Sequence, residues 1–453
     1  MMRVADSAGV ATSRRLLFVA GSAHVLGGLA SWLDYLLPGL AERGWEPVLG
    51  LVEGARHHRP ERMLAVHPSE RWVRIPCHTG TPEGRCRALV RALAAVGPAV
   101  AIGVNVPDLY PAVNRARRAG SAVRALMTVH AIEPELYADA ARFRSVLDGV
   151  GATNRLACRL LETVSGLEGE RVFYAPYGLD PEPAPGEPRI GGDPIAIGYV
   201  GRLEQAQKRV LDLPRVAAAL DELGVRATWR VAGAGPEEAA LRAALPEGRT
   251  ELLGTVPAAE LPERLYRTLD ALLVPSRWET GPLVAWEAMA EGVPVVASRY
   301  VGSGLEAALV HDENVLLFEV GDAAGAARQL ARLAQEPALR ERLIAGGRRL
   351  LQERFSRARS IDAWERVVER VLASPPRPSA PDPDVPPATG RLERWLGPGR
   401  AERIRQALRR IGPESGSGGE WPHAYGRGED CEEFLRRAGA LDCPAMAGAC
   451  SPR

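Results

Sequence analysis

Short apolar runs alternate along the chain with longer stretches in which apolar residues recur every three or four positions. Such runs are typical of buried β-strands, and such stretches are typical of amphipathic helices. The stretches predict helices at 29–43, 83–96 and 356–372. The runs predict strands at 16–20, 48–52, 72–75, 100–104, 125–129, 195–200, 228–232, 271–274 and 293–297. Strands that alternate with helices indicate parallel α/β construction.

Two segments rich in proline divide this pattern. The segment 180–194 predicts a linker between two α/β domains of similar size. Seven prolines between 375 and 387 predict a second linker. Beyond it, Ile404, Leu408 and Ile411 would lie on one face of an arginine-rich helix, which could rest on an anionic membrane surface. A solvated or loosely docked helix is the alternative.

Composition excludes several classes of protein. The 57 Lys+Arg and 56 Asp+Glu residues leave a net charge of +1, which gives no field that would attract nucleic acid. Six cysteines without a CxxC pair argue against a disulfide scaffold and a structural zinc site, so we expect a cytoplasmic protein. No apolar run reaches the roughly 18 residues of a membrane span. Arg14-Arg15 before the first run suits a signal peptide, but the short run favours a buried strand.

A dense group of candidate residues follows the predicted strand 271–274. Gly281-Pro282 suits the start of a helix, because proline is preorganised for the first helical position. The backbone N–H groups from Thr280 to Leu283 would then be available to a phosphate or to sugar hydroxyls.

Glu279 and Glu287 flank this predicted helix start. If helical rise applied across the interval, it would separate them by about 12 Å, which exceeds the roughly 5–9.5 Å of a glycosidase carboxylate pair. The spacing instead suits two carboxylates that hold opposite ends of an elongated ligand. Two solvated glutamates at helix ends are the alternative.

A second group, Gly201, Arg202 and Lys208, follows the predicted strand 195–200. Arginine offers a planar fork for phosphate oxygens and lysine a point charge, so the two cations could stabilise a departing diphosphate. Lys208 is the one lysine in a chain that otherwise uses arginine at every basic position. An ordinary solvated loop is the alternative.

Three weaker signals remain. Gly27-Gly28 lies between the first strand and the first helix, where a plain turn would also suit it. His130 ends a predicted strand at the edge of a sheet, where a structural histidine is the commoner case. Gly233–Pro236 contains GxG without the rest of the dinucleotide fingerprint, so it gives little support to NAD binding.

Over residues 15–372 these motifs resemble the retaining, nucleotide-sugar-dependent glycosyltransferases of family 4, which have the GT-B fold. Glu279 and Glu287 match that family's E-x7-E motif, and residues 287–298 match its continuation. The other matches are Gly201-Arg202 with Lys208, Gly233–Pro236, Gly27-Gly28, His130 and the segment 177–180. The chain departs from the family at Tyr177, where asparagine is usual, and at Thr280, where glycine is common.

The resemblance implies an α/β GT-B architecture, in which two Rossmann-like domains face each other across a cleft. We expect an acceptor-binding domain at 1–183 and a donor-binding domain at 184–355. A crossover helix at 356–372 would pack on the first domain. A proline-rich linker at 373–390 and a disordered basic tail at 391–453 would follow.

The resemblance also implies an enzyme of the EC 2.4 class. It would transfer a sugar from a UDP-, GDP- or ADP-sugar to a glycan, lipid-linked or small-molecule acceptor, with retention and without a metal or other cofactor. Arg202 and Lys208 would neutralise the diphosphate, and His130 would orient the sugar. Glu279 would bind the sugar hydroxyls and Glu287 the ribose. Further donor contacts are expected from Gly28, Gly201, Thr280, Gly281, Pro282 and Leu283.

Other functions fit parts of the pattern. A different GT-B enzyme, such as a phosphorylase or a nucleotide-sugar epimerase, would share the fold. A catalytically silent sugar-nucleotide-binding protein and a nicotinamide oxidoreductase are further alternatives. The expected partners are the donor and the acceptor, without nucleic acid, together with a peripheral membrane contact through the basic tail.

Overall fold

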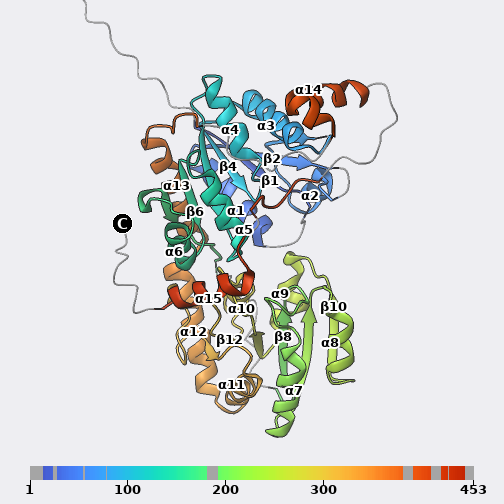
Figure 1. The fold of residues 1–453 in the computed structure, drawn as a ribbon. Coiled ribbons are helices and arrows are strands. Elements are labelled where there is room, and N and C mark those ends of the chain that lie inside the picture. Colours follow the sequence, from blue (N-terminus) through green and yellow to red (C-terminus); the bar gives the residue numbers. More distant parts are fainter. Residues whose placement is uncertain are drawn as a thin grey trace, which may run out of the picture.

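The computed structural model describes residues 14–23, 28–54, 57–77, 79–180, 192–380, 391–409, 420–426 and 428–443. Two parallel sheets, each with helices on both faces, lie one above the other (Figure 1). This arrangement confirms the predicted α/β fold with two Rossmann-like units. The expected boundary at 183/184 falls outside the described residues and stays a prediction.

The first sheet has the strand order β3-β2-β1-β4-β5-β6-β7. Its strands are β1 (Arg15–Ala20), β2 (Glu46–Glu53), β3 (Trp72–Pro76), β4 (Val100–Val104), β5 (Arg124–Val129), β6 (Gly149–Ala152) and β7 (Val172–Tyr174). Its helices are α1 (Gly28–Glu42), α2 (Pro60–Val66), α3 (Pro82–Val96), α4 (Leu109–Arg118), α5 (Pro134–Phe143) and α6 (Arg155–Thr163). The first apolar run is therefore the buried strand β1.

The second sheet has the order β10-β9-β8-β11-β12-β13. Its strands are β8 (Ile195–Val200), β9 (Ala227–Ala232), β10 (Thr250–Gly254), β11 (Ala271–Val274), β12 (Val295–Ser298) and β13 (Leu316–Phe318). Its helices are α7 (Asp212–Glu222), α8 (Glu238–Ala244), α9 (Leu261–Arg264), α10 (Leu283–Ala290), α11 (Ala323–Gln335) and α12 (Pro337–Arg354). In both sheets the order reverses once, between β1 and β4 and between β8 and β11.

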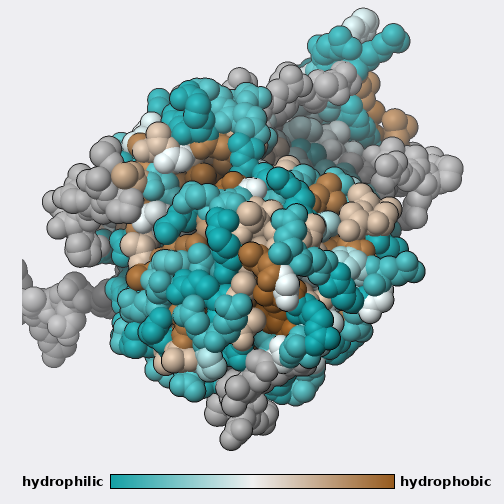
Figure 2. All heavy atoms as spheres, turned by 90° about the horizontal axis from the view of Figure 1, so that it is seen from below, coloured by the Kyte–Doolittle hydropathy of each residue, from teal (hydrophilic) through white to brown (hydrophobic). Residues whose placement is uncertain are grey.

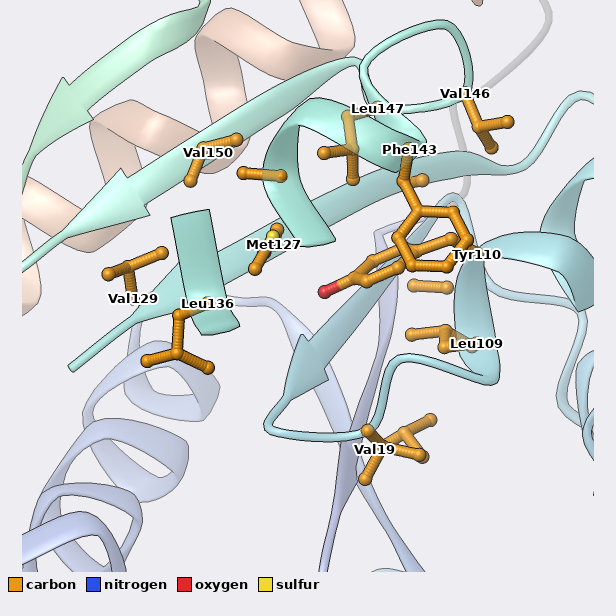
Figure 3. Packing of buried hydrophobic residues seen from close by; sticks show 14 of the residues in the cluster. Val19, Leu109, Tyr110, Met127, Val129, Leu136, Phe143, Val146, Leu147 and Val150 are labelled. Carbon is orange, nitrogen blue, oxygen red and sulfur yellow. The ribbon is translucent and has the colours of Figure 1, made fainter. Parts of the chain in front are cut away.

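Each face of the first sheet has its own apolar core, because successive side chains of a strand point to opposite faces. In β1, Leu17 and Val19 pack toward α3, α4 and α5, whereas Leu16 and Phe18 pack toward α1. Figure 3 shows Val19 in the first of these cores, which also contains Leu109 and Tyr110 of α4 and Phe143 of α5. Since both faces are covered, the strands are apolar throughout, as parallel strands usually are.

The helix α13 (Arg357–Ala373) follows the second sheet in sequence but packs on the first. Ser356 caps it by accepting a hydrogen bond from the N–H of Arg359. The side chain of Trp364 is 1% exposed and packs between α1 and the first sheet. Residues 15–174 and 195–318 are thus joined by a helix as well as by the linker, most of which lies outside the described residues.

Four strands are absent from the sequence prediction: β6, β7, β10 and β13. Three are short or lie at an edge of a sheet, and β6 has the sequence Gly-Val-Gly-Ala. A Cβ atom on Gly151 would lie 2.6 Å from the ring of Trp364, and one on Gly149 would lie 2.8 Å from Val371. These glycines therefore make room for α13, although they weaken the strand pattern in the sequence.

The tail differs from the disorder expected for it. Among its described residues, α14 (Arg391–Arg409) and α15 (Cys431–Leu441) are helical, with a kink in α14 at Gly397. Phe434 and Leu435 of α15 are buried in the core of the first sheet. The proline content and the arginine-rich composition concealed these anchors, which depend on partners far away in the sequence.

No helix among the described residues is both long enough and apolar enough to cross a membrane. Seen from below, the surface is mainly hydrophilic, with apolar residues in small separate patches (Figure 2).

We expect Gly151→Val to lower the midpoint of thermal unfolding, because the added side chain would overlap the buried ring of Trp364. Overpacking of this kind costs about 1–3 kcal/mol. Ala122→Val, at an exposed loop position, is the control and should leave the midpoint nearly unchanged. Equal midpoints for both variants would contradict the packing role of Gly151.

Candidate active site

The two predicted groups of polar residues meet at one edge of the second sheet. β8 and β11 are neighbouring strands, and the loops after them leave the sheet at its point of reversal. Open α/β sheets bind ligands at such points. The N–H of Arg277 donates to the carbonyl of Gln207 (2.7 Å), and the side chain of Gln207 donates to the carbonyl of Trp278 (3.0 Å). The two loops are therefore held together by their own hydrogen bonds.

Lys208 and Glu279 form an ion pair between these loops, with Nζ 2.6 Å from Oε1. The same carboxylate oxygen accepts a hydrogen bond from Ser276 (2.7 Å). The side chain of Glu279 is 8% exposed and that of Lys208 is 20% exposed. Glu204 accepts from the N–H of Lys208 (2.8 Å) and fixes the loop that carries the ammonium. The two loops thus bring a largely buried positive charge and its counter-charge into direct contact.

Arg202 lies at the outer end of the same loop. The residue is exposed, and its guanidinium donates a hydrogen bond to Gln207 (2.6 Å), whose side chain in turn donates to the carbonyl of Trp278. The loop is braced from the side: Leu203 donates its N–H to the carbonyl of Ala234 (3.0 Å), and a side chain on Gly233 would overlap the carbonyl of Gly201. In this fold the GxG segment brings two loops close together.

The loop from Thr280 to Leu283 reaches toward the first sheet. Thr280 donates its hydroxyl to the carbonyl of His130 (2.6 Å). A Cβ atom on Gly28 would lie 2.6 Å from Leu283. The start of α1 and the start of α10 therefore approach each other across the two halves, with Gly281 and Pro282 in the loop between. Gly27 lies outside the described residues.

Glu287 is on α10, whereas Glu279 is in the loop before it. The estimate of their separation from helical rise therefore does not apply. Tyr266 donates its hydroxyl to Glu287 (2.5 Å). Burial raises the pKa of the Glu287 carboxyl above its ordinary value, and the Tyr266 hydrogen bond only partly opposes this.

His130 is enclosed by aromatic rings at the end of β5. The centroid of its ring lies 4.8 Å from that of Trp32 and 5.6 Å from that of Tyr177. Its Nδ1 shares a hydrogen bond with the Tyr177 hydroxyl (2.7 Å), and its buried Nε2 has no partner among the described residues. Burial lowers the pKa of His130 to about 3. The imidazole is therefore neutral near pH 7 and suits hydrogen bonding better than it suits carrying a charge.

Several residues of this site were not predicted as members of it. Ser276, Gln207 and Tyr266 support Glu279, the loops and Glu287, and nothing in their spacing signals this. Tyr177 was noted only as a departure from asparagine, although its hydroxyl holds His130. Within the described part of the chain, no three His, Cys, Asp or Glu side chains lie close enough to hold a metal ion.

Residues 194–336 match the family model described as glycosyl transferases group 1. The chain is 36% identical over 104 residues to a lipopolysaccharide core biosynthesis glycosyltransferase of Rhizobium meliloti, covering 23% of this chain and 30% of that protein. It is 36% identical over 193 residues to a D-inositol 3-phosphate glycosyltransferase of Thermomonospora curvata, covering 40% and 42%. The matches thus span less than half of these curated relatives.

Solved structures extend the likeness in fold to both sheets. HepE of Anabaena, in complex with UDP and glucose, superimposes with a TM-score of 0.64 at 16% identity. The match covers 78% of this chain and 99% of HepE. The GT-B fold predicted from the motifs is therefore confirmed.

The buried imidazole predicts a loss of stability in acid. Below pH 6.5 the histidine of the unfolded chain binds a proton, whereas folded His130 stays neutral down to about pH 3. The unfolded state then binds more protons, so the free energy of unfolding falls as the pH falls through this window. When the unfolded state binds one more proton than the folded state, the free energy of unfolding changes by about 1.4 kcal/mol per pH unit. Urea unfolding of the wild type and of His130→Gln at several pH values should give a steeper decline for the wild type. Parallel curves would contradict this.

Proposed function

We propose that the chain transfers a sugar from a nucleotide diphosphate sugar to a hydroxyl-bearing acceptor with retention of configuration, as the match of residues 194–336 to the group 1 glycosyl transferases suggests. The observation that carries this proposal is the pairing of Lys208 with Glu279 at the point of reversal of the second sheet. An ammonium and a carboxylate side by side suit a ligand with an anionic diphosphate next to a neutral sugar.

In this proposal Lys208 turns from Glu279 to the diphosphate when the donor binds, and Arg202 closes over it from the exposed side. Glu279 is then free to accept hydrogen bonds from sugar hydroxyls. Ser276 still holds the carboxylate in place, so the exchange needs little rearrangement. Glu287, on the next helix, would bind the ribose.

The reaction step follows from this arrangement. The acceptor oxygen bonds to the anomeric carbon on the face from which the phosphate oxygen leaves, and the acceptor proton passes to that departing oxygen. Lys208, Arg202 and the N–H groups of the loop from Thr280 to Leu283 stabilise the negative charge that develops on the diphosphate. Gly28 allows α1 to close over the donor, and neutral His130 orients the sugar.

The first donors to test are UDP-sugars, because the structurally similar HepE binds UDP and glucose. For the acceptor, the names of the relatives indicate lipopolysaccharide core and inositol phosphate, which share hydroxyl groups on a ring. We propose that the charges supplied by Lys208 and Arg202 make a metal ion unnecessary. Activity that is lost in chelator and restored by a divalent cation would contradict this part.

Lys208→Ala and Glu279→Gln should each lower kcat for UDP-sugar turnover by about 10²–10³-fold, as loss of one transition-state contact does. The matched control is Arg215→Ala, which removes an exposed cation from α7 of the same domain and should leave turnover unchanged. UDP should also raise the thermal midpoint of the wild type, with about 2.7 kcal/mol of stabilisation at 100 times Kd.

These measurements decide between the alternatives. Release of UDP that increases on addition of an acceptor supports a transferase over a phosphorylase or an epimerase. Turnover that is unchanged in folded Lys208→Ala and Glu279→Gln would refute the assigned mechanism. Stabilisation by UDP without any turnover would favour a catalytically silent binding protein.

We also propose a peripheral contact of α14 with an anionic membrane. Its inner face is fixed to the start of α3, where Glu402 accepts from Thr79 and Thr81 (2.7 Å each). Its outer face carries Trp395, which is 90% exposed, and Leu408, which is 62% exposed. Four exposed arginines without ion pairs among the described residues accompany them: Arg391, Arg394, Arg400 and Arg403. Exposed apolar and cationic side chains on one helix suit contact with an anionic membrane surface.

The wild type should sediment with vesicles that contain phosphatidylglycerol and not with vesicles of phosphatidylcholine alone. Arg394→Glu/Arg400→Glu/Arg403→Glu should abolish this binding, and added salt should weaken it, because attraction between exposed charges is screened. The control is Arg215→Glu/Arg226→Glu/Arg242→Glu, which reverses three exposed arginines elsewhere. Equal sedimentation of the two triple variants would reject a role for α14.

A further inference from the structure

Residues 420–426 and 428–443, here called the strap, carry no recognisable motif yet cross from the first half of the molecule to the second. Figure 1 shows α15 between the two sheets, with the preceding segment running up toward the first sheet. The strap lies beyond the segment matched by the family model, which ends at residue 336. Its position therefore needs an explanation of its own.

The first part of the strap is fixed to loops at the carboxyl edge of the first sheet. After β2, the Glu420 carboxylate accepts from the N–H of His57 (2.8 Å), and Trp421 donates to the carbonyl of Glu53 (2.9 Å). Further along, the N–H groups of Tyr425 and Gly426 donate to Asp139 of α5 (2.9 and 2.7 Å). The strap thus passes from β2 to α5 and crosses the β1/β4 point of reversal.

The second part of the strap joins both halves. Phe434 and Ala438 are fully buried, and the ring of Phe434 lies 5.2 Å from that of Tyr137. Glu432 pairs with Arg277, next to the candidate donor site (2.6 Å). Asp442 accepts three backbone N–H groups of the loop behind Glu279, from Gly302 (2.7 Å), Gly304 (3.0 Å) and Leu305 (2.7 Å).

The docking is close on both sides. A Cβ atom on Gly426 would lie 2.6 Å from that of Ala138, and one on Gly304 would overlap the backbone of Asp442. A ligand at one site typically changes the affinity of a second site by about 5–150-fold, which limits the free energy available to move a segment of the chain. Displacement of the strap would expose Trp421, Phe434 and Leu435 and break several charge-assisted hydrogen bonds. The free energy needed for this is larger than ligand binding of that kind supplies. The strap is therefore a permanent part of the fold and not a detachable latch.

A small cavity lies under the strap at this edge of the first sheet. Its polar lining comes from Asn105 after β4, Thr128 of β5, Asp139 of α5 and His423 of the strap itself. Asn105 adopts a positive φ of 55°, and its Oδ1 is buried without a hydrogen-bond partner among the described residues. A buried acceptor atom without a partner favours a ligand that can donate a hydrogen bond.

We propose that the strap is a wall of the acceptor site, and that Asn105, Asp139 and His423 bind a hydroxyl group of a glycosyl acceptor and determine acceptor specificity. The proposal rests on the transferase function proposed above. In this proposal the donor binds at the point of reversal of the second sheet. A hydroxyl-bearing end of the acceptor binds at the point of reversal of the first sheet, and the strap contacts both sheets' loops at these points.

The test measures UDP release from the UDP-sugar that the wild type hydrolyses fastest, with a panel of 4-nitrophenyl glycosides as acceptor probes. For the best glycoside, Asn105→Gly and His423→Ala should raise KM at least about tenfold. Hydrolysis without glycoside and KM for the UDP-sugar should stay within about twofold. Glycine keeps the positive φ at position 105, and Asn105→Asp, which keeps an acceptor oxygen, should recover part of the loss.

The matched control is His57→Ala, which removes an exposed imidazole near the strap but outside the cavity and keeps the N–H bonded to Glu420. An unchanged glycoside KM in both cavity variants would overturn the proposal, as would equal losses of transfer and hydrolysis. It would also fail if no glycoside increased UDP release above the rate with water. Failure of the transferase function itself would appear differently, as the absence of both hydrolysis and stabilisation by UDP.

Discussion

The ion pair between Lys208 and Glu279 depends on where two parallel strands end. β8 and β11 are neighbours although they are far apart in sequence, so the loops after them begin side by side, whereas the helices that follow, α7 and α10, pack in different apolar cores. Each of the two charges is partly shielded from water at this point and would be costly to leave unpaired. Pairing them offsets this cost. A ligand that brings both an anion and hydroxyl groups can substitute for both partners, with the anion beside Lys208 and the hydroxyl groups beside Glu279.

The two halves of the molecule are joined by more than a linker. α13 returns to the first sheet through Trp364, and the strap connects Asp139 in one half with Arg277 and the Gly302–Leu305 loop in the other. Thr280 and His130 add a hydrogen bond at the centre. These contacts come from segments widely separated in the chain, so the two halves are held together at several separate places.

Sequence patterns were sufficient for most of the fold because the strands of a parallel sheet are apolar on both faces. They failed at β6, where the glycines that admit Trp364 remove the strand signal. Spacing and charge also predicted Lys208, Glu279 and Glu287 as site residues, and the structure places Lys208 and Glu279 side by side. They could not reveal Ser276 or Tyr266, whose roles exist only through contacts, nor the strap, whose partners are spread from Glu53 to Leu305. Local pattern predicts an element, whereas a docking surface depends on the distant residues that shape it.

The strap also has a consequence for the order of synthesis. Residues 15–372, which hold both sheets and nearly all of α13, leave the ribosome before the strap does. At about 5–20 residues per second, the strap follows roughly 4–14 s later. During that interval the edges that the strap covers, including the sites for Trp421 and Phe434, are open to water and to other proteins. The nascent chain therefore has a defined period in which a chaperone can bind the surface that the strap finally occupies.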